Sequence, residues 1–181
     1  MSWKSLEAAL VKLNEGALAA LAPGASSQAL DRLERDVRQV LPESFRTAWG
    51  EHDGVAGELF TMLEILSTEQ IAGEWRGLRD YDGSSGGLEA IADGPVRALW
   101  TSTAWIPIVL IGGETRHFCL DLDPAPGGVV GQIIHASPKS EERRVVAPDT
   151  GAFLELVAAA LRDGKYEEDG DRLDVCDALG I

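Results

Sequence analysis

The stretch that decides the fold is Trp105–Ile134, WIPIVLIGGETRHFCLDLDPAPGGVVGQII. It spans three short runs that are rich in β-branched and aromatic residues: 105–111, 116–122 and 131–135. Gly112-Gly113 breaks the first run and favours a tight turn. Asp123-Pro124 ends the second run, because the residue before a proline is pushed out of helical geometry. The stretch therefore predicts an antiparallel meander.

Helical patterns occupy the chain on both sides of this stretch. Three stripes of apolar residues precede it at a spacing of three or four: Trp3, Leu6, Leu10, Leu13 and Ala17; Leu30, Leu33, Val37 and Val40; Phe45, Ala48 and Trp49. They predict helices over 3–21, from about residue 28 to 41, and from Pro42 to about Gly54. Ser67 and Gln70 match a capping box and predict a helix that carries Ile71, Trp75 and Leu78. Asp149-Thr150 predicts a last long helix, with Phe153, Leu154, Val157 and Leu161, that Gly164 ends.

The remaining segments complete an α+β prediction. We expect strands at 59–66 and at 142–147, the latter with Val145 and Val146 inward, and short helices or turns at 88–92 and 96–101. The predicted fold class is a mixed, mainly antiparallel sheet with helices packed against it, including N-terminal helices and a C-terminal helix. The predicted organisation is a helical lead at 1–26, an α+β domain at 27–164 and an acidic tail at 165–181, where 173–179 forms a docking helix.

Composition limits the classes of function. The chain has 181 residues, enough for one domain, and its hydrophobic content of 45% allows a real core. The formal net charge of −14 opposes binding to nucleic acid phosphates or anionic lipid and favours a protein partner with a basic surface. The alternative is that the charge only keeps the protein in solution.

Cysteine and hydropathy patterns exclude further classes. Cys119 and Cys176 are far apart and outside any CxxC pattern, which argues against a disulfide scaffold and a zinc site. The N-terminal residues do not match a secretory signal, and no apolar stretch approaches the roughly 20 residues that span a bilayer. We therefore expect a soluble, cytoplasmic protein without a cofactor, a metal or a membrane contact, either a monomer or a weak homodimer.

Several motifs together resemble the SUKH superfamily, the Smi/Knr group named for a fungal cell-wall-assembly regulator. They are Leu41-Pro42 with Phe45-Arg46 and Gly54, Trp105-Ile106-Pro107-Ile108, Cys119–Pro124 with Gly127 and Gly131–Ile134, and Phe153-Leu154. The resemblance covers about residues 30–160. Glu51-His52-Asp53-Gly54 departs from the Asn-Gly ending typical of this group.

The resemblance implies an α+β fold and a binding role without catalytic residues. Many bacterial members are immunity proteins that neutralise a toxin, often a nuclease, and fungal members regulate cell-wall synthesis. The leading interpretation is a non-enzymatic immunity protein that binds a cognate toxin of a polymorphic toxin or toxin–antitoxin system. The alternative is a regulatory or scaffold protein of cell-wall or envelope synthesis.

Asp121 and Asp123 are the residues on which the alternative to a binding protein, an enzyme, would depend. Residues i and i+2 of a strand face the same side, so the two carboxylates could meet one cation or act as an acid/base pair. The interpretation that we favour places Asp121 on the solvent face and Asp123 in the Pro124 turn. His117 could share a strand face with Asp121, but His52, His117 and His135 match no zinc motif. Cys119 reads as a small buried residue rather than a nucleophile.

Tryptophans and exposed acids are the candidate partner-binding residues. We expect Trp49 and Trp105 in the core and Trp100 partly exposed, and tryptophan is enriched in interface hot spots. The segment Gly83–Gly87 lacks the context of a phosphate-binding loop and is read as a linker. The predicted partner-binding residues are Trp100, Asp121, Asp123, Asp82 and Glu89.

Overall fold

The computed structural model describes residues 3–13, 15–56, 59–80, 90–112, 116–138 and 140–180. The helices are α1 (Lys4–Leu13), the 3₁₀ helix η1 (Glu15–Ala20), α2 (Ser27–Val37), α3 (Glu43–Glu51), α4 (Thr68–Asp80), α5 (Thr150–Arg162) and α6 (Cys176–Leu179). The strands are β1 (Leu63–Ile65), β2 (Ile91–Asp93), β3 (Trp105–Ile111), β4 (Arg116–Asp121), β5 (Gln132–Ala136), β6 (Glu142–Ala147), β7 (Glu167–Asp169) and β8 (Arg172–Asp174). The predicted α+β class is confirmed.

A six-stranded sheet in the order β1-β3-β4-β5-β6-β2 organises the molecule. β3, β4 and β5 form the predicted antiparallel meander, with Ile106 opposite Leu120 and Cys119 opposite Ile134. The register of β3 shifts between Pro107 and Val109. Only β2 is parallel to its neighbour, β6, among the pairings of the described strands. β7 and β8 form a separate hairpin.

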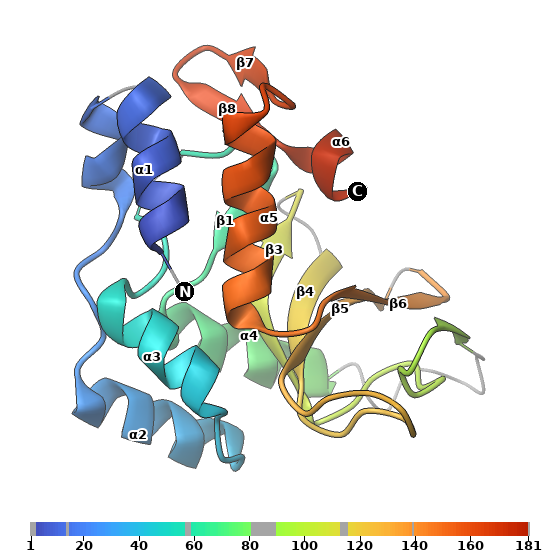
Figure 1. Cartoon of the computed structure of the whole chain (residues 1–181). Helices are drawn as coiled ribbons and strands as arrows, with labels where there is room; N and C mark the ends of the chain where they lie inside the picture. Colours follow the sequence, from blue (N-terminus) through green and yellow to red (C-terminus); the bar gives the residue numbers. More distant parts are fainter. Residues whose placement is uncertain are drawn as a thin grey trace.

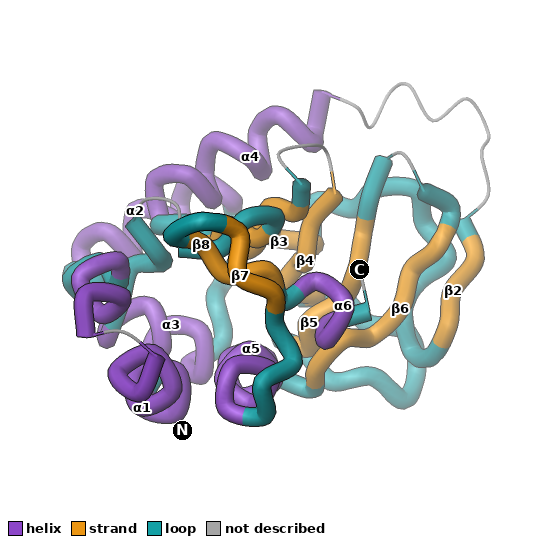
Figure 2. Tube along the Cα trace, turned by 90° about the horizontal axis from the view of Figure 1, so that it is seen from above, coloured by secondary structure: helices purple, strands orange, loops and turns teal. Residues whose placement is uncertain are grey.

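Helices cover the two faces of the sheet unequally (Figures 1 and 2). α5 lies along one face, with α1 and α3 packed against α5, and α4 lies on the other face beside β3. α2 lies outside α4 and contacts it. None of the described helices is both long enough and apolar enough to span a bilayer.

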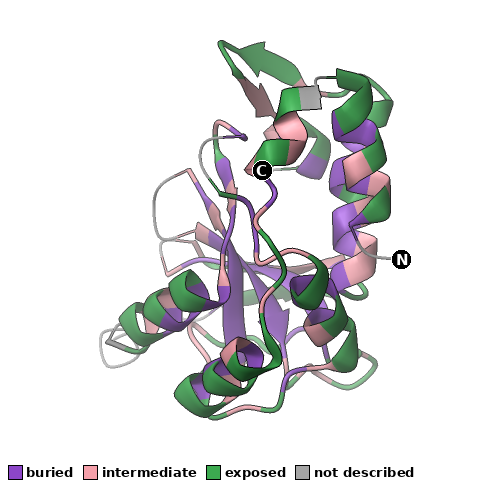
Figure 3. Ribbon diagram, turned by 90° about the vertical axis from the view of Figure 1, so that its left-hand side faces the viewer, coloured by how far each residue is buried: buried purple, intermediate pink, exposed green. Residues whose placement is uncertain are grey.

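The main core includes buried residues of α5, of the strands and of the helices α1 to α4, and the buried residues run through the strands and the inward sides of the helices (Figure 3). Asp149 begins α5 as predicted, because its carboxylate accepts the Ala152 N–H at 2.8 Å. Seven residues of α5 are buried, and Phe153 meets Phe118 of β4 edge to face at 5.5 Å.

The predicted caps and turns around α3 and α4 are also confirmed. Ser67 and Gln70 exchange the two hydrogen bonds of a capping box at 3.3 Å and 2.9 Å. Gly54, which follows α3, has a φ of 78°, and a Cβ there would lie 2.6 Å from the Ile65 carbonyl oxygen. Only glycine fits this left-handed position against the backbone of β1.

Several sequence expectations differ from the structure in detail. The helix expected at 3–21 divides into α1 and η1, and the strand expected at 59–66 forms only over Leu63–Ile65. Val40 is 84% exposed, since α2 ends at Val37 and Arg38 takes a left-handed conformation. A short helix or turn was expected at 88–92, where residues 91 and 92 instead belong to strand β2. The helix or turn expected at 96–101 is not a helix. Val145 and Val146 pack on opposite faces, as neighbours in a strand must.

Both chain ends pack onto the core of the α+β domain. Trp3 is fully buried, its indole donates to the Ala48 carbonyl at 2.8 Å, and its ring meets Trp49 at 6.2 Å. At the other end, Val175 and Leu179 are buried beside α5. The predicted organisation into a helical lead, an α+β domain and an acidic tail, with boundaries at residues 26 and 164, stays a prediction.

Trp3→Ala is expected to lower the free energy of unfolding by about 3–5 kcal/mol, because it removes a large buried ring and leaves the Ala48 carbonyl without its donor. Urea unfolding measures this change. Val11→Ala, on the same helix at a side chain that is 45% exposed, is the matched control and should cost no more than about 0.5 kcal/mol. Equal stability of the Trp3→Ala variant and the wild type would contradict packing of this helix onto the core.

His135 lies on the α5 side of the sheet, opposite Phe118, at 8% exposure. Burial, and after it the positive charges of Arg144, Arg143 and Arg116, together lower the pKa of His135 to about 4. The unfolded chain therefore binds a proton between about pH 6.5 and 4 that the folded chain does not bind. The stability that folding gains by keeping His135 neutral is therefore present in full above pH 6.5 and is lost as the pH falls toward 4.

We expect the wild type to lose about 2 kcal/mol more than His135→Gln in free energy of unfolding when the pH falls from 7 to 5. Urea unfolding of both proteins at both pH values measures this difference. Parallel losses in the two proteins would show that another group controls the acid sensitivity.

Candidate functional site

The face of the sheet opposite α5 is rich in buried polar groups. Alternation along the strands places these residues on it: Trp105, His117, Cys119, Asp121, Gln132, Ile134, Ala136, Arg143 and Val145. The side chains of His117, Asp121, Gln132 and Arg143 are at most 2% exposed. Buried polar groups need partners, so this face requires a cover that supplies hydrogen bonds.

Residues 94–104, called the crossing segment here, supply much of that cover. Val96 of this segment is buried in a second apolar cluster with Trp105, Cys119, Ile134 and Ala136. This cluster is separate from the main core under α5. A chain segment without helix or strand is therefore held against the sheet by both apolar and polar contacts.

Arg143 of β6 attaches the crossing segment to the sheet. Its guanidinium donates to the carbonyl oxygens of Leu99 at 3.1 Å and Trp100 at 2.8 Å, and to those of Ser140 and Glu142 at 2.7 Å each. The side chain is fully buried, and no carboxylate of the described residues pairs with it. Carbonyl oxygens therefore replace water around this cation.

Two indole rings complete the surroundings of Arg143. The guanidinium carbon lies 5.3 Å from the centre of the Trp100 ring and 5.8 Å from that of Trp105. A cation over an aromatic face at this distance is attracted by the ring electrons. The arginine thus fixes both the backbone and the ring of Trp100.

Asp121 and Gln132 hold the other end of the crossing segment. The Gln132 amide donates to the Asp121 carboxylate and to the Pro95 carbonyl, both at 3.0 Å. Asp121 also accepts the backbone N–H of Asp123 at 3.1 Å. Burial raises the pKa of Asp121, and the bonds from Asp123 and Gln132 oppose that shift.

Asp123 makes an exposed contact with the same segment. Arg97 donates to its carboxylate at 2.8 Å and to its carbonyl oxygen at 2.9 Å. Asp121 and Asp123 therefore both stabilise a loop, one from the interior and one from the surface. The solvent-facing position expected for Asp121 is wrong, because its side chain has 0% exposure.

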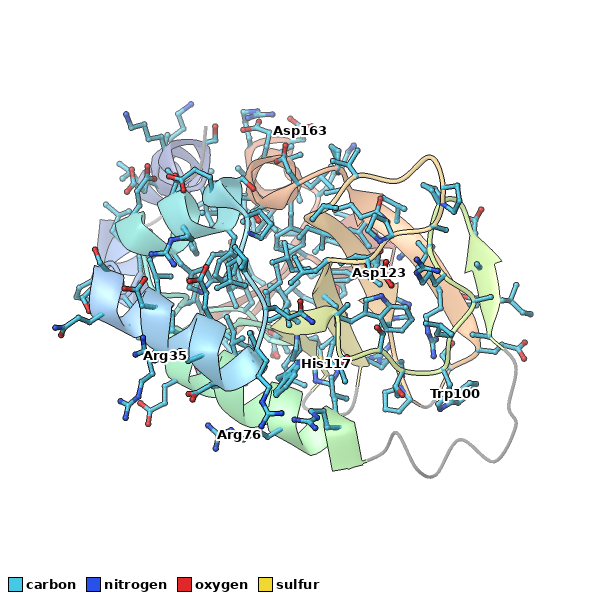
Figure 4. All side chains as sticks on the ribbon, turned by 90° about the horizontal axis from the view of Figure 1, so that it is seen from below. Arg35, Arg76, Trp100, His117, Asp123 and Asp163 are labelled. Atoms are coloured by element: carbon cyan, nitrogen blue, oxygen red, sulfur yellow. The ribbon has the colours of Figure 1, made fainter. Side chains whose placement is uncertain are left out.

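A tryptophan pocket opens between this face of the sheet and the C-terminal half of α4 (Figure 4). We define it by these lining residues: Trp75, Leu78, Arg79, Trp100, Thr101, Ser102, Thr103, Trp105, His117, Cys119, Ala136, Ser137 and Pro138. The indole of Trp75 donates to the Thr103 carbonyl at 3.1 Å, which ties α4 to the crossing segment. Its ring lies under the guanidinium carbon of Arg79 at 4.8 Å. His117 contacts the Glu74 carboxylate at 3.2 Å beside the pocket.

The size of the pocket limits what it can accept. The space enclosed between the side chains is about 30 Å³, and about 440 Å³ when the mouth that opens to solvent is counted. Pockets for small metabolites enclose roughly 300–1,000 Å³. The enclosed space here matches a single water molecule. The walls and the mouth, and not a deep interior, are therefore the surfaces that another molecule can contact.

Three of the five predicted partner-binding residues, Trp100, Asp121 and Asp123, lie in the described part of the chain. Trp100 is partly exposed, as expected, and lines the tryptophan pocket. Asp121 is buried and Asp123 is exposed beside it, both at the crossing segment. Asp82 and Glu89 lie outside the described residues, as does the predicted linker Gly83–Gly87. A partner-binding role for these residues stays a prediction.

The other candidate groups, two tryptophans and the cysteines, contribute to packing and show no sign of reactivity. The expected core positions of Trp49 and Trp105 and the buried position of Cys119 are confirmed. Burial raises the pKa of the Cys119 thiol, which leaves little thiolate for nucleophilic attack. Burial likewise raises the pKa of Cys176 to about 12. Across the described part of the chain, no three His, Cys, Asp or Glu side chains come close enough to hold a metal ion.

Sequence reasoning missed Arg143 and Trp75 as members of the site. Arg143 stands in the run Glu-Glu-Arg-Arg, which reads as a solvated strand end. The available signal is alternation, because Arg143 shares a strand face with Val145. Trp75 was predicted as a helix residue, and the contact of its indole with residue 103 has no local signature.

A family model and two individual relatives show similarity of this chain to the same group of proteins. The sequence model of the SMI1 / KNR4 family (SUKH-1) matches residues 24–156. The chain is 29% identical over 169 residues to the cell wall biosynthesis/cell cycle regulator smi1 of Schizosaccharomyces pombe, covering 82% of this chain and 33% of that protein. It is 31% identical over 83 residues to a glucan synthesis regulatory protein of Neurospora crassa, covering 46% of this chain and 15% of that protein. The chain thus spans a third or less of these relatives.

Arg143→Met is expected to release the crossing segment, because the carbonyl oxygens of Leu99 and Trp100 lose their donor. The free energy of unfolding should fall by about 3 kcal/mol. Amide hydrogen exchange over 94–104 should become faster under native conditions, and its rate is the decisive measurement. Arg144→Met is the matched control, since that guanidinium points to the other face and donates to the Gly180 carbonyl at 2.8 Å. Unchanged exchange over 94–104 in Arg143→Met would refute the role of this arginine.

Proposed function

The chain belongs to the SMI1 / KNR4 family (SUKH-1), and from this membership we propose that it is a regulatory module that binds another protein and catalyses no reaction. The observation that carries the proposal is the similarity along 82% of the chain to a protein named as a cell wall biosynthesis/cell cycle regulator. Cell-wall or envelope synthesis is therefore the process in which we place the module. Its partner would be an enzyme of that synthesis or a protein that controls one.

The surroundings of the candidate catalytic groups support a binding role. Asp121 is buried in hydrogen bonds to Gln132 and to backbone, and Cys119 is buried with a raised thiol pKa. His117 and Glu74 contact one another at the edge of a pocket that encloses only about 30 Å³. These groups stabilise the packing of the sheet, and a substrate has little space beside them.

The tryptophan pocket supports a protein partner and not a small ligand. Three indoles line it, and Trp100 is held from behind by Arg143, so its partly exposed ring is already fixed before binding. A rigid aromatic side chain at a surface contributes strongly to protein association, because little side-chain entropy is lost when it is covered. We therefore assign Trp100 as the central contact residue.

A second candidate function is the neutralisation of a toxin. The observation that favours it is the formal charge of −14, which complements a basic surface such as that of a nuclease. An immunity protein would bind such a cognate toxin tightly and in a salt-sensitive way. Both functions use protein binding, so the identity of the partner distinguishes them.

The experiment is a capture of partners from a lysate of the source cell at low salt, with wild type and Trp100→Ala as baits and mass spectrometry as the readout. Recovery of an envelope-synthesis protein that depends on Trp100 is the expected result, with a loss of about tenfold or more in the variant. Leu156→Ala, at an exposed residue of α5 on the opposite side of the sheet, is the control and should capture the partner as the wild type does.

One outcome would overturn the regulatory function, and another would overturn the assignment of Trp100 as the contact residue. A single basic toxin that salt elutes would establish the immunity function instead. Equal recovery by wild type and Trp100→Ala would remove the tryptophan pocket from the binding surface. Thermal unfolding of both variants shows whether the fold is kept.

A further inference from the structure

Arg79 of α4 brings a positive charge to the tryptophan pocket. Its side chain is exposed, and its guanidinium carbon lies 4.8 Å from the centre of the Trp75 ring. The attraction between a cation and a ring face uses none of the five N–H donors of an arginine in hydrogen bonds to oxygen. Arg79 is therefore held at the pocket while its donors stay available to another molecule.

Arg79 pairs with no carboxylate in the part of the chain that the structure describes. Three arginines elsewhere form ion pairs with acids at 2.8–3.1 Å: Arg46, Arg97 and Arg162. Glu74, on the same helix as Arg79, contacts His117 instead at 3.2 Å. Arg143 already donates to four carbonyl oxygens. Of the two arginines that lie over the indoles of this pocket, Arg79 is the one that can still bind an anion.

The lining of the pocket has a different charge balance from the whole chain. Acidic side chains outnumber basic ones by 30 to 16 in the sequence, yet no aspartate or glutamate stands among the described residues that line this pocket. Leu78, Pro138 and three indoles make its walls largely apolar, and Arg79 adds the positive charge. An apolar wall beside this cation is complementary to a segment that carries an apolar side chain next to a carboxylate.

A basic side chain is a poor occupant of the same pocket. Arg79 already lies over the Trp75 ring, and Arg143 lies 5.3 Å and 5.8 Å from the centres of the Trp100 and Trp105 rings. A lysine or a methylated ammonium group binds best over an aromatic face, where it would meet the charge of an arginine here. The two arginines therefore disfavour cations locally, although the charge of −14 attracts them to the chain as a whole.

We propose that the pocket binds a short segment of the partner protein in which a large apolar side chain lies next to an aspartate or glutamate. This inference rests on the proposed function, which makes the tryptophan pocket the binding surface. The apolar side chain covers the ring of Trp100 in the mouth of the pocket, where the space is about 440 Å³. The carboxylate accepts two hydrogen bonds from the Arg79 guanidinium.

The test begins with a selection from a phage library of random short peptides on the immobilised full chain. Peptides that also bind immobilised Trp100→Ala are removed, so the remaining ones depend on the tryptophan pocket. We expect these peptides to share a large apolar residue next to an aspartate or glutamate. The net charge of −14 favours basic peptides, so enrichment of acidic ones identifies a local contact.

Fluorescence anisotropy then compares the most enriched peptide, labelled with fluorescein, with a version in which its acid is replaced by the matching amide. Arg79→Gln should weaken binding of the acidic peptide by about fivefold and change that of the amide peptide by less than about twofold. Arg76→Gln is the matched control. Arg76 is exposed one turn earlier on the same helix and lines the groove between α2 and α4, away from Trp100 (Figure 4). This control removes the same charge and should keep both peptides within about twofold of the wild type.

Three results would overturn the proposal, and they separate it from the proposed function. Peptides that depend on Trp100 but carry no acid, or carry a lysine or arginine in its place, would leave the pocket as a binding surface of different chemistry. A selection without any peptide that depends on Trp100 would remove the segment, and the lysate capture tests the binding function by itself. Equal weakening of both peptides by Arg79→Gln would show that this arginine only supports the packing of Trp75. Thermal unfolding of each variant verifies that the fold is kept.

Discussion

A buried arginine that pairs with carbonyl oxygens, and with no carboxylate of the described residues, is the constraint on which the second face of the sheet depends. Arg143 has 0% exposure, so its five N–H donors must find acceptors inside the protein. The carbonyl oxygens of Leu99 and Trp100 are available only if the crossing segment lies across the sheet. The same placement covers Cys119 and Ile134 with Val96. The need of the Arg143 guanidinium for acceptors thus fixes the crossing segment, which has no regular structure. The tryptophan pocket forms along the edge of that segment.

The elements that could be predicted from sequence are those with a local cause. The meander follows from runs of β-branched residues broken at Gly112-Gly113 and Asp123-Pro124, and α4 follows from the Ser67–Gln70 box. β2 has no such cause, because its parallel pairing joins Ile91 to Glu142 across a long stretch of chain. Val40 continues the stripe of α2 in sequence, but the left-handed Arg38 turns the chain away before Val40 can reach the core.

The candidate site was only partly predictable, because alternation shows which side chains share a strand face and not what covers that face. His117 and Asp121 do lie on one face, yet they contact different partners, Glu74 and Gln132. Trp100 was predicted as partly exposed from its position between elements, and the structure adds why its ring is fixed. Arg143 looked like a surface charge, since a buried cation held by carbonyl oxygens leaves no pattern in sequence.

Net charge is a poor guide to the chemistry of a single surface of this protein. The −14 total includes the acidic β7–β8 hairpin, which lies at the opposite end of the molecule from α2 (Figure 1). Exposed charges separated by more than about 8 Å are largely screened at physiological salt. A molecule that contacts the space between α2 and α4 therefore experiences the side chains that line it, Arg32 and Arg76 together with Asp36, Asp53 and Glu69, more strongly than the distant acids. The distant acids still slow the approach of any large polyanion, because the long-range field of the whole chain acts before contact is made.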